Sequence, residues 1–354
     1  LIVGTIVILK QIDLAKSRDI GYSQEGLITV SLTDDITKNY EVIKNELIRK
    51  NLIVNMTRSN SRITDINSNN FLGWPGKPES EKVMFVTVVR GYDYAETMGA
   101  KMLYGRDFSK EFSSDSSAII INKAALELMG LEGDPIGTSL DLWGDKRNLV
   151  GVIDNILMGS PYEEVRPMFM IIDNWGGSAT LRLRPTDNMQ STLAGVQEVF
   201  EQYNPAYPFE YQFVDEAFQR KYTTINLTRK LSTIFAALTI FITGLGLFGL
   251  ASYMAEQRIK EIGIRKVLGA SVTSLVGLMS KDFAKLVLLS FVISAPFAYW
   301  LLHNYLQRYT IRTTLDWWIF ALTGALALFF AIVVVVNQAR RAALANPASS
   351  LRNE

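Results

Sequence analysis

The sequence predicts a multi-pass α-helical membrane protein with three full spans, a truncated first span and a large α+β extracytoplasmic domain. Three observations lead to this fold class. Three long uncharged stretches lie in the last third of the chain, a shorter one, Leu1–Leu9, begins it, and residues 10–230 have the mixed composition of a water-soluble domain. The hydrophobic fraction of 48% in 354 residues averages over these parts, and it is high for a wholly soluble protein.

The long uncharged stretches are Leu231–Ala255, Leu286–Gln307 and Trp317–Ala339, with 25, 22 and 23 residues. At about 1.5 Å per residue, each helix reaches roughly 33–38 Å, enough to cross a hydrocarbon core of about 30 Å. The alternative, a buried soluble helix, is disfavoured because three such stretches do not fit one soluble core. The second stretch is the weakest, since Pro296 predicts a kink inside it. We expect transmembrane helices over residues 231–254, 286–307 and 317–338.

The first nine residues, Leu1–Leu9, are uncharged but reach only about 14 Å as a helix. They have no start methionine and no basic region, so they do not resemble a complete signal peptide. We interpret residues 1–9 as the end of a first transmembrane helix whose beginning lies upstream, which makes the chain a fragment or half of a longer polypeptide. A strand or a simple hydrophobic anchor is the alternative.

Basic residues beside the spans predict the orientation, because cytoplasmic loops carry an excess of Lys and Arg. The link over residues 255–285 carries six basic residues, whereas residues 308–316 carry only Arg308 and Arg312. We therefore expect a cytoplasmic coupling loop at 255–285, an outer loop at 308–316 and a cytoplasmic tail at 339–354. Residues 10–230 then lie outside. Arg229 and Lys230 oppose this orientation, but long translocated domains follow the rule weakly.

Residues 10–230 alternate short runs rich in Val, Ile, Thr and Phe with helical runs, which predicts an α+β domain. The expected strands are Leu27–Leu32, Val83–Val89, Ala118–Ile121, Asn148–Ile153, Met168–Ile172, Thr180–Arg184 and Phe209–Val214. The expected helices are Asn39–Lys50, Asn122–Met129 and Asn188–Tyr203.

The polar segments at either end of this domain, Lys10–Ile20 and Asp215–Lys230, are compatible with helix and continuous with a span. We expect them to extend the spans outward as an antiparallel pair, or stalk. The Ser- and Asn-rich segment Ser59–Asn70 is typical of a mobile loop, and a linker is a better interpretation than a ligand site.

The composition excludes several function classes. The chain has no cysteine and one histidine, His303, so disulfides, thiolate chemistry and Cys- or His-rich metal sites are excluded. The net charge of +1 argues against a nucleic-acid binder. The spans carry no Asp, Glu, Lys or Arg, which argues against a proton antiporter.

Catalytic motifs are missing from the sequence. The nearest approach to a P-loop, Gly73–Pro78, has the wrong spacing, so this chain is not expected to bind ATP phosphates through such a loop. The carboxylate pairs Asp34–Asp35 and Glu163–Glu164 are better explained as solvated surface charge than as a catalytic dyad. We expect no enzyme activity in this chain.

The segment Ala255–Ser271, AEQRIKEIGIRKVLGAS, is the richest candidate site. Ile259, Ile262, Val267 and Leu268 can share one apolar face of a helix, and basic residues occupy the other. A basic interfacial helix that anchors the cytoplasmic side is one interpretation. A docking surface for a cytoplasmic partner is the other, and the residues alone leave both open.

Several segments carry a resemblance to a known family. These are Glu256-Gln257-Arg258 followed by EIGIRKVLGAS, the span from Thr233 to Ala251, the tail QARRAA with NPASSLR, and, more loosely, AIIINKAALELMG, DPIG, LVGVIDN and EEVRPMFM in the domain. Together they resemble FtsX-like, MacB-type permeases of ABC transporters along essentially the whole chain. One departure is Asp154-Asn155-Ile156, where related sequences often have Asp-Phe-His, so any role of that histidine is unsupported here.

The resemblance implies four spans per unit, a dimer of such units, and a location in the bacterial inner membrane with the domain in the periplasm. It implies a separate ABC ATPase subunit that binds ATP and Mg, with no cofactor in this chain. The residues expected to dock that ATPase are Lys260, Glu261, Gly263, Ile264, Arg265, Lys266, Leu268 and Gly269. Further implied partners are a second permease unit, a periplasmic adaptor or outer-membrane channel, and membrane lipid.

The function implied by the resemblance is ATP-driven motion transmitted to the outer domain, for export of a drug, peptide or lipid-linked substrate. An FtsX-like envelope regulator, which controls a cell-wall hydrolase without transport, is the alternative. A sensory receptor is less well supported, because only 15 residues follow Ala339. A membrane-bound enzyme is the least supported class.

Overall fold

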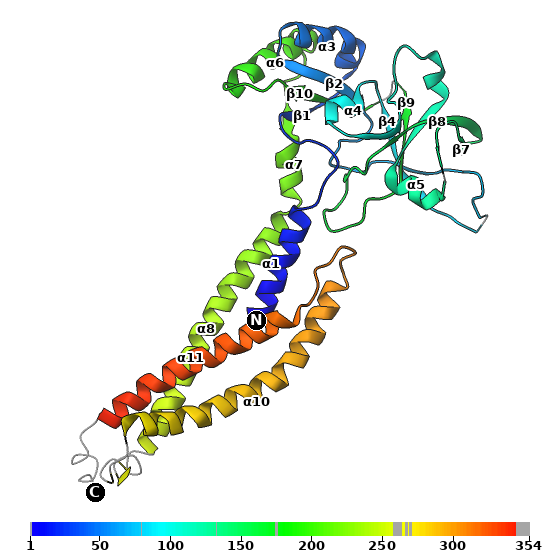
Figure 1. The fold of residues 1–354 in the computed structure, drawn as a ribbon. Coiled ribbons are helices and arrows are strands. Elements are labelled where there is room, and N and C mark those ends of the chain that lie inside the picture. Colours follow the sequence, from blue (N-terminus) through cyan, green and yellow to red (C-terminus); the bar gives the residue numbers. More distant parts are fainter. Residues whose placement is uncertain are drawn as a thin grey trace. The chain divides into compact units, whose positions relative to one another are not determined.

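The computed structural model describes residues 2–344 apart from 79, 132, 174–175, 258–263, 266–267 and 269–270. The chain divides into two compact units (Figure 1). We call them the helical unit, residues 1–16 and 224–354, and the domain, residues 17–223. The predicted fold class, membrane helices combined with a large α+β domain, is confirmed.

The helical unit contains the three spans that the sequence predicts. Its helices are α1 (Ile2–Lys16), α8 (Thr223–Gln257), α10 (Val272–Leu306) and α11 (Trp317–Leu344). The candidate spans within them are Asn226–Met254, Phe283–Leu306 and Trp317–Gln338. Only 11%, 6% and 17% of their most apolar windows is buried, so most of this apolar surface faces outward, as a lipid environment requires.

Close packing joins α10 to α11. Gly324 of α11 lies against the ring of Phe291, and a Cβ at Gly324 would come within 2.9 Å of that ring. Val3 and Val7 of α1 pack with Leu302, Leu306 and Ile319 in one buried cluster. Small residues that allow close approach are typical of helix contacts in membranes.

The domain is built on an eleven-stranded mixed sheet in which two parts can be distinguished. The first half-sheet has the order β11-β1-β10-β2 and the second has the order β4-β9-β6-β8-β5, with β3 beside β4 and β7 beside β8. The strands of the first are β1 (Leu27–Ser31), β2 (Ile53–Ser59), β10 (Ser178–Leu183) and β11 (Tyr211–Phe213). Those of the second are β3 (Asn69–Phe71), β4 (Met84–Arg90), β5 (Met102–Gly105), β6 (Ala118–Asn122), β7 (Ser139–Leu142), β8 (Asp145–Ile153) and β9 (Met168–Ile172).

Three helices cover the first half-sheet: α2 (Asp34–Lys38), α3 (Tyr40–Arg49) and α6 (Met189–Tyr203). Thr33 and Asn188 cap α2 and α6, because each side-chain oxygen accepts a hydrogen bond from the backbone three residues on. The apolar residues of these helices share one core with β1, β2 and β10.

The second half-sheet packs against α5 (Lys123–Met129) in a separate core. Asn122 begins this helix, since its Oδ1 accepts hydrogen bonds from the backbone N–H groups of Ala125 and Met168, each at 2.9 Å. One side chain therefore caps α5 and fixes the start of β9. A third core includes residues of α4 (Tyr94–Met98) and α7 (Val214–Arg220). A short 3₁₀ helix, Ser113–Ser117, precedes β6.

The sequence predicted seven of the strands and all three longer domain helices to within a few residues. It missed β2, β3, β5 and β7, and the five-residue helices α2 and α4. Residues 60–68 form a loop between β2 and β3, as expected for the segment Ser59–Asn70, and Ser59, Ser61, Ile63 and Thr64 are buried. Side-chain hydrogen bonds to β4 hold this segment, and a polar composition does not reveal such contacts.

The stalk segments have definite ends. On the N-terminal side α1 ends at Lys16, and on the C-terminal side a turn at Lys221 and Tyr222 separates α7 from α8. The segment Asp215–Lys230 is therefore not one continuous helix. The pairing of the two segments as a stalk and the exact domain boundaries stay predictions.

Candidate functional site

Of the eight predicted docking residues, the structure describes three, Ile264, Arg265 and Leu268. Ile264 and Leu268 lie one helical turn apart, since the Leu268 N–H donates to the Ile264 carbonyl at 3.0 Å. Their exposed fractions are 54% and 80%. Arg265 lies in the same turn of helix, so two exposed apolar side chains and a basic residue share this turn. The other predicted docking residues lie outside the described part of the chain: Lys260, Glu261, Gly263, Lys266 and Gly269.

Within the helical unit, a polar cluster connects α1 to residues 311–316, which lie between α10 and α11. The Lys10 ammonium donates to Asp316 at 2.6 Å. The buried Gln11 side chain donates to the Ile311 carbonyl at 2.7 Å and accepts from the Thr313 N–H at 2.8 Å. Lys10, Thr314 and Trp318 all donate to the Asp316 carboxylate, and these hydrogen bonds hold its pKa below its usual range.

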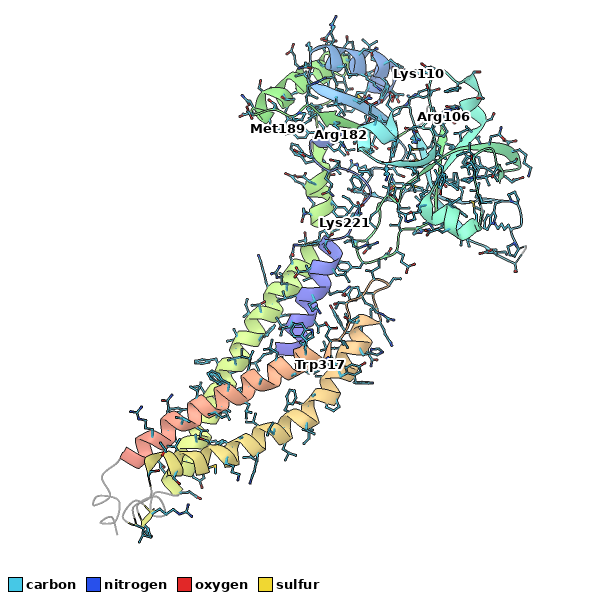
Figure 2. The ribbon with its side chains drawn as sticks, in the orientation of Figure 1. Arg106, Lys110, Arg182, Met189, Lys221 and Trp317 are labelled. Atoms are coloured by element: carbon cyan, nitrogen blue, oxygen red, sulfur yellow. The ribbon has the colours of Figure 1, made fainter. Side chains whose placement is uncertain are left out.

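A second polar cluster lies in the domain, at the residues where its chain begins and ends. We call it the clamp: Arg18 and Lys221, together with the backbone carbonyls that they contact. Figure 2 marks Lys221, which follows α7 directly. These residues adjoin α1 and α8 in the sequence, so the clamp is where both covalent connections to the helical unit meet the domain.

Lys221 closes the clamp at its C-terminal side. Its ammonium donates to the Met158 carbonyl at 2.6 Å, to the Gly159 carbonyl at 2.9 Å and to the Thr64 carbonyl. Burial lowers the pKa of Lys221, because desolvation disfavours the charged form. Three carbonyl acceptors match the three N–H bonds of an ammonium, so Lys221 joins two separate loops through one group.

Arg18 closes the clamp at its N-terminal side. Its guanidinium donates to the Pro161 carbonyl at 2.8 Å and to the Glu163 carbonyl at 2.7 Å. Nearby, the rings of Tyr162 and Tyr222 pack edge to face with centroids 6.4 Å apart. Both ends of the domain therefore hold the same loop, residues 156–166, which is most of the connection between β8 and β9.

The segment that enters the domain also packs against the start of this loop. Gly21 has φ of +76°, and a Cβ there would lie 1.7 Å from the Asn155 carbonyl oxygen. The Asn155 side chain accepts the Ala124 N–H of α5 at 2.9 Å. The asparagine that departs from the family pattern is thus a structural residue, which links Gly21, the loop and α5.

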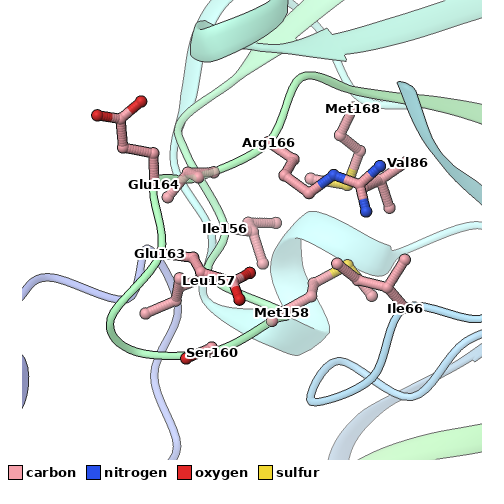
Figure 3. Close-up of a pocket in the computed structure, with 12 residues that line it drawn as sticks. Ile66, Val86, Ile156, Leu157, Met158, Ser160, Glu163, Glu164, Arg166 and Met168 are labelled. Carbon is pink, nitrogen blue, oxygen red and sulfur yellow. The ribbon is translucent and has the colours of Figure 1, made fainter. Parts of the chain in front are cut away.

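A shallow pocket adjoins the clamp (Figure 3). Its lining comes from loop 156–166, Ile66, Val86 and Met168. Figure 3 shows that the side chains of Glu163 and Glu164 point in different directions, so they do not form a carboxylate pair. Within the described residues, no group of three or more His, Asp or Glu side chains could hold a metal ion.

Sequence reasoning missed the clamp. Arg18 and Lys221 lie in segments that were interpreted only as stalk, and their partners are backbone carbonyls, which leave no sequence signal. The one available hint was position, because each basic residue stands close to where a membrane helix meets the domain.

Comparison with known proteins supports the resemblance. Residues 233–347, which include most of α8 and all of α10 and α11, match the family described as FtsX-like permease C-terminal. The chain is 23% identical over 192 residues to the macrolide export ATP-binding/permease protein MacB of Neisseria gonorrhoeae, covering 51% of this chain and 30% of that protein. It is 20% identical over 189 residues to the probable syringafactin export ATP-binding/permease protein SyfD of Pseudomonas syringae, covering 50% of this chain and 29% of that protein. The chain thus spans less than a third of the length of these relatives.

Solved structures similar to this chain include two extracytoplasmic domains. The periplasmic region of MacB from Actinobacillus actinomycetemcomitans is 14% identical, with a TM-score of 0.40, and the match covers 61% of this chain and 98% of that one. The extracellular domain of YknZ, a noncanonical ABC-type transporter from Gram-positive bacteria, is 16% identical, with a TM-score of 0.37. That match covers 52% of this chain and 97% of the YknZ domain. Residues 233–347 of the helical unit thus match the FtsX-like permease C-terminal family, and about half of the chain is similar to part of MacB.

Proposed function

We propose that this chain transmits the ATP-driven motion of a partner ATPase to its α+β domain, as the permease subunit of an ABC-type system in the bacterial inner membrane. One observation carries the proposal. α8 is a single described helix of 35 residues, Thr223–Gln257, and spans about 52 Å at the usual rise. It begins two residues after Lys221 of the clamp and ends three residues before Lys260, the first of the predicted docking residues.

The geometry supports a mechanical role for α8. A helix of this length exceeds the hydrocarbon core of about 30 Å, so it reaches past the bilayer and can carry displacement of the docking segment to the other side. The exposed Ile264 and Leu268 offer an apolar contact for the partner, and Arg265 adds charge. In the domain, Lys221 passes displacement to the two loops that its ammonium holds.

The partners follow from this role. ATP and Mg bind to the ATPase subunit, a second permease unit completes the dimer, and an adaptor or an outer-membrane channel contacts the domain in the periplasm. The names of the relatives state macrolide export for MacB and syringafactin export for SyfD. We propose by analogy that this system exports a drug, peptide or lipid-linked substrate.

The docking role is tested by charge reversal. We expect Arg265→Glu with Lys266→Glu to remove the ATPase that co-purifies with the tagged chain from native membranes, and to abolish the ATPase activity of the eluate. Arg312→Glu is the matched control, because it reverses a charge in the predicted outer loop and should leave both readouts unchanged. Undiminished co-purification and turnover in the double variant would reject the docking role.

A further inference from the structure

The domain holds a second cavity, at the C-terminal end of α6. Its volume is about 180 Å³, below the range of about 300–1,000 Å³ that is typical of sites for drug-sized ligands, so it suits a smaller group. The walls come from the last turn of α6, from residues 204–210 that lead to β11, from β1 and from the start of α2. None of the residues that contact Arg18 or Lys221 lines this cavity, so it is separate from the clamp.

Asn204, which ends α6, supplies an amide donor to the cavity. The residue is 5% exposed. Thr33 Oγ1 accepts the Ile36 N–H at 3.2 Å and donates to Asn204 Oδ1 at 2.9 Å, so the amide is held by its oxygen. Among the residues that the structure describes, Asn204 Nδ2 donates to no acceptor. Its two N–H bonds are therefore available to a carbonyl group of a ligand.

The lining of the cavity is negatively charged. It contains Glu201 and Glu210 and no Lys, Arg or His. Gln197 donates to Glu201 at 2.6 Å, and neither carboxylate forms an ion pair within the described part of the chain. Arg62 reaches the lining at Ser31, 3.5 Å away. Two carboxylates against this one guanidinium favour a positively charged ligand.

Aromatic rings complete the lining. Tyr207 is 57% exposed. The ring of Phe209 lies 5.0 Å from that of Phe200 and 5.5 Å from that of Tyr211, measured between centroids. Aromatic faces attract a Lys ammonium or an Arg guanidinium, and the aliphatic stem of either side chain packs on an apolar wall. An aromatic wall beside two carboxylates therefore suits a basic side chain.

We propose that this cavity binds a Lys or Arg side chain of a partner polypeptide. The charged group meets the carboxylates of Glu201 and Glu210, and Tyr207 covers the aliphatic stem. The Asn204 amide donates to a backbone carbonyl of the partner. This free donor favours a polypeptide over a simple amine, because an amine has no carbonyl to accept from it. The inference goes beyond the proposed function and stands on the domain alone, so its failure would leave the coupling proposal intact.

The site is tested by titrating short ligands onto the full chain in an uncharged detergent, with saturation-transfer NMR as the measurement. The probes are acetyl-Gly-Lys-Gly-amide, the same peptide with norleucine in place of lysine, and butylamine. We expect the lysine peptide to bind more tightly than the norleucine peptide, which has no charge, and than butylamine, which has no carbonyl. Equal affinity of the two peptides, or no binding of the lysine peptide, would overturn the proposal. Equal affinity of butylamine would overturn the assignment to a polypeptide.

Neutralisation of the lining tests the role of its charge. Glu201 and Glu210 are exposed, so the double variant Glu201→Gln with Glu210→Gln should fold, and we expect it to bind the lysine peptide at least about fivefold more weakly. Glu198→Gln is the matched control, because Glu198 lies on the same helix, contacts Lys50 at 3.5 Å and does not line the cavity. Unchanged binding in the double variant, or an equal loss in the control, would reject the site.

Asn204→Asp tests the amide donor. It keeps an oxygen that accepts from Thr33 and replaces the N–H donors by a second acceptor. We expect the affinity for the lysine peptide to fall and the affinity for butylamine to be retained. An unchanged preference for the lysine peptide over butylamine would contradict the contact between Asn204 and a backbone carbonyl.

Discussion

Lys221 is the residue with the clearest structural consequence for coupling. It donates three hydrogen bonds to carbonyls of two loops from one ammonium, next to the start of α8. A charged donor at one point is suited to joining loops that no strand pairing connects, because hydrogen bonds to charged groups are stronger than neutral ones.

Removal of this ammonium should destabilise the domain. We expect Lys221→Met to lower the free energy of unfolding by about 1–3 kcal/mol, since buried carbonyls are left without donors. The measurement is thermal unfolding in detergent, in which Tm should fall by about 2–4 °C for each kcal/mol of lost stability. Lys146→Met, which removes an exposed lysine paired with Asp141, should change Tm little. Equal shifts in the two variants would contradict a specific role for Lys221.

At the scale of elements, the domain is held where its entering segment meets the loop between β8 and β9. Arg18 and Gly21 both contact this loop or the residue before it. The Leu157 N–H also donates to the Ile20 carbonyl at 3.0 Å. The entering segment is therefore packed against the loop closely enough that only glycine fits at residue 21.

Gly21→Ala tests this close approach. The new Cβ would meet the Asn155 carbonyl at 1.7 Å, so the backbone must shift, at a further cost of about 1–3 kcal/mol. Gly76→Ala is the matched control, because Gly76 has a similar φ of +80° but nothing within 4 Å of the new Cβ. It should carry only the left-handed penalty of about 1–2 kcal/mol. Chemical denaturation compares the two, and similar losses would show that the contact with Asn155 is unimportant.

At the scale of the whole molecule, the proposal depends on which side of the bilayer each part occupies. The coupling loop and the domain must lie on opposite sides if α8 transmits motion between them. The basic residues of 255–285 and the sparse charge of 308–316 predict this orientation.

Single-cysteine labelling tests the orientation, since the chain has no native cysteine. Ser191→Cys in the domain and Ser274→Cys near the start of α10 are both exposed positions. In spheroplasts, we expect a membrane-impermeant maleimide to label Ser191→Cys at once and Ser274→Cys only after permeabilisation. Labelling of both from the same side would refute the predicted topology.

The sequence by itself determined the three spans, the α+β class of the domain and the FtsX-like resemblance. These features depend on the length of uncharged stretches, on local periodicity and on short motifs. All three are properties of residues that lie close together in the sequence. Seven strands and the longer helices were predictable for the same reason.

Only the tertiary structure decided how the domain is held together. Arg18 and Lys221 bind backbone carbonyls of loop 156–166 and, for Lys221, Thr64, more than 60 residues away in the chain. In the sequence, Arg90 is one charged residue within a strand. In the structure, Asp107, Tyr94 and Phe108 surround its guanidinium. Carbonyl acceptors are present at every residue and long-range pairs have no fixed spacing, so neither produces a pattern that a sequence can show.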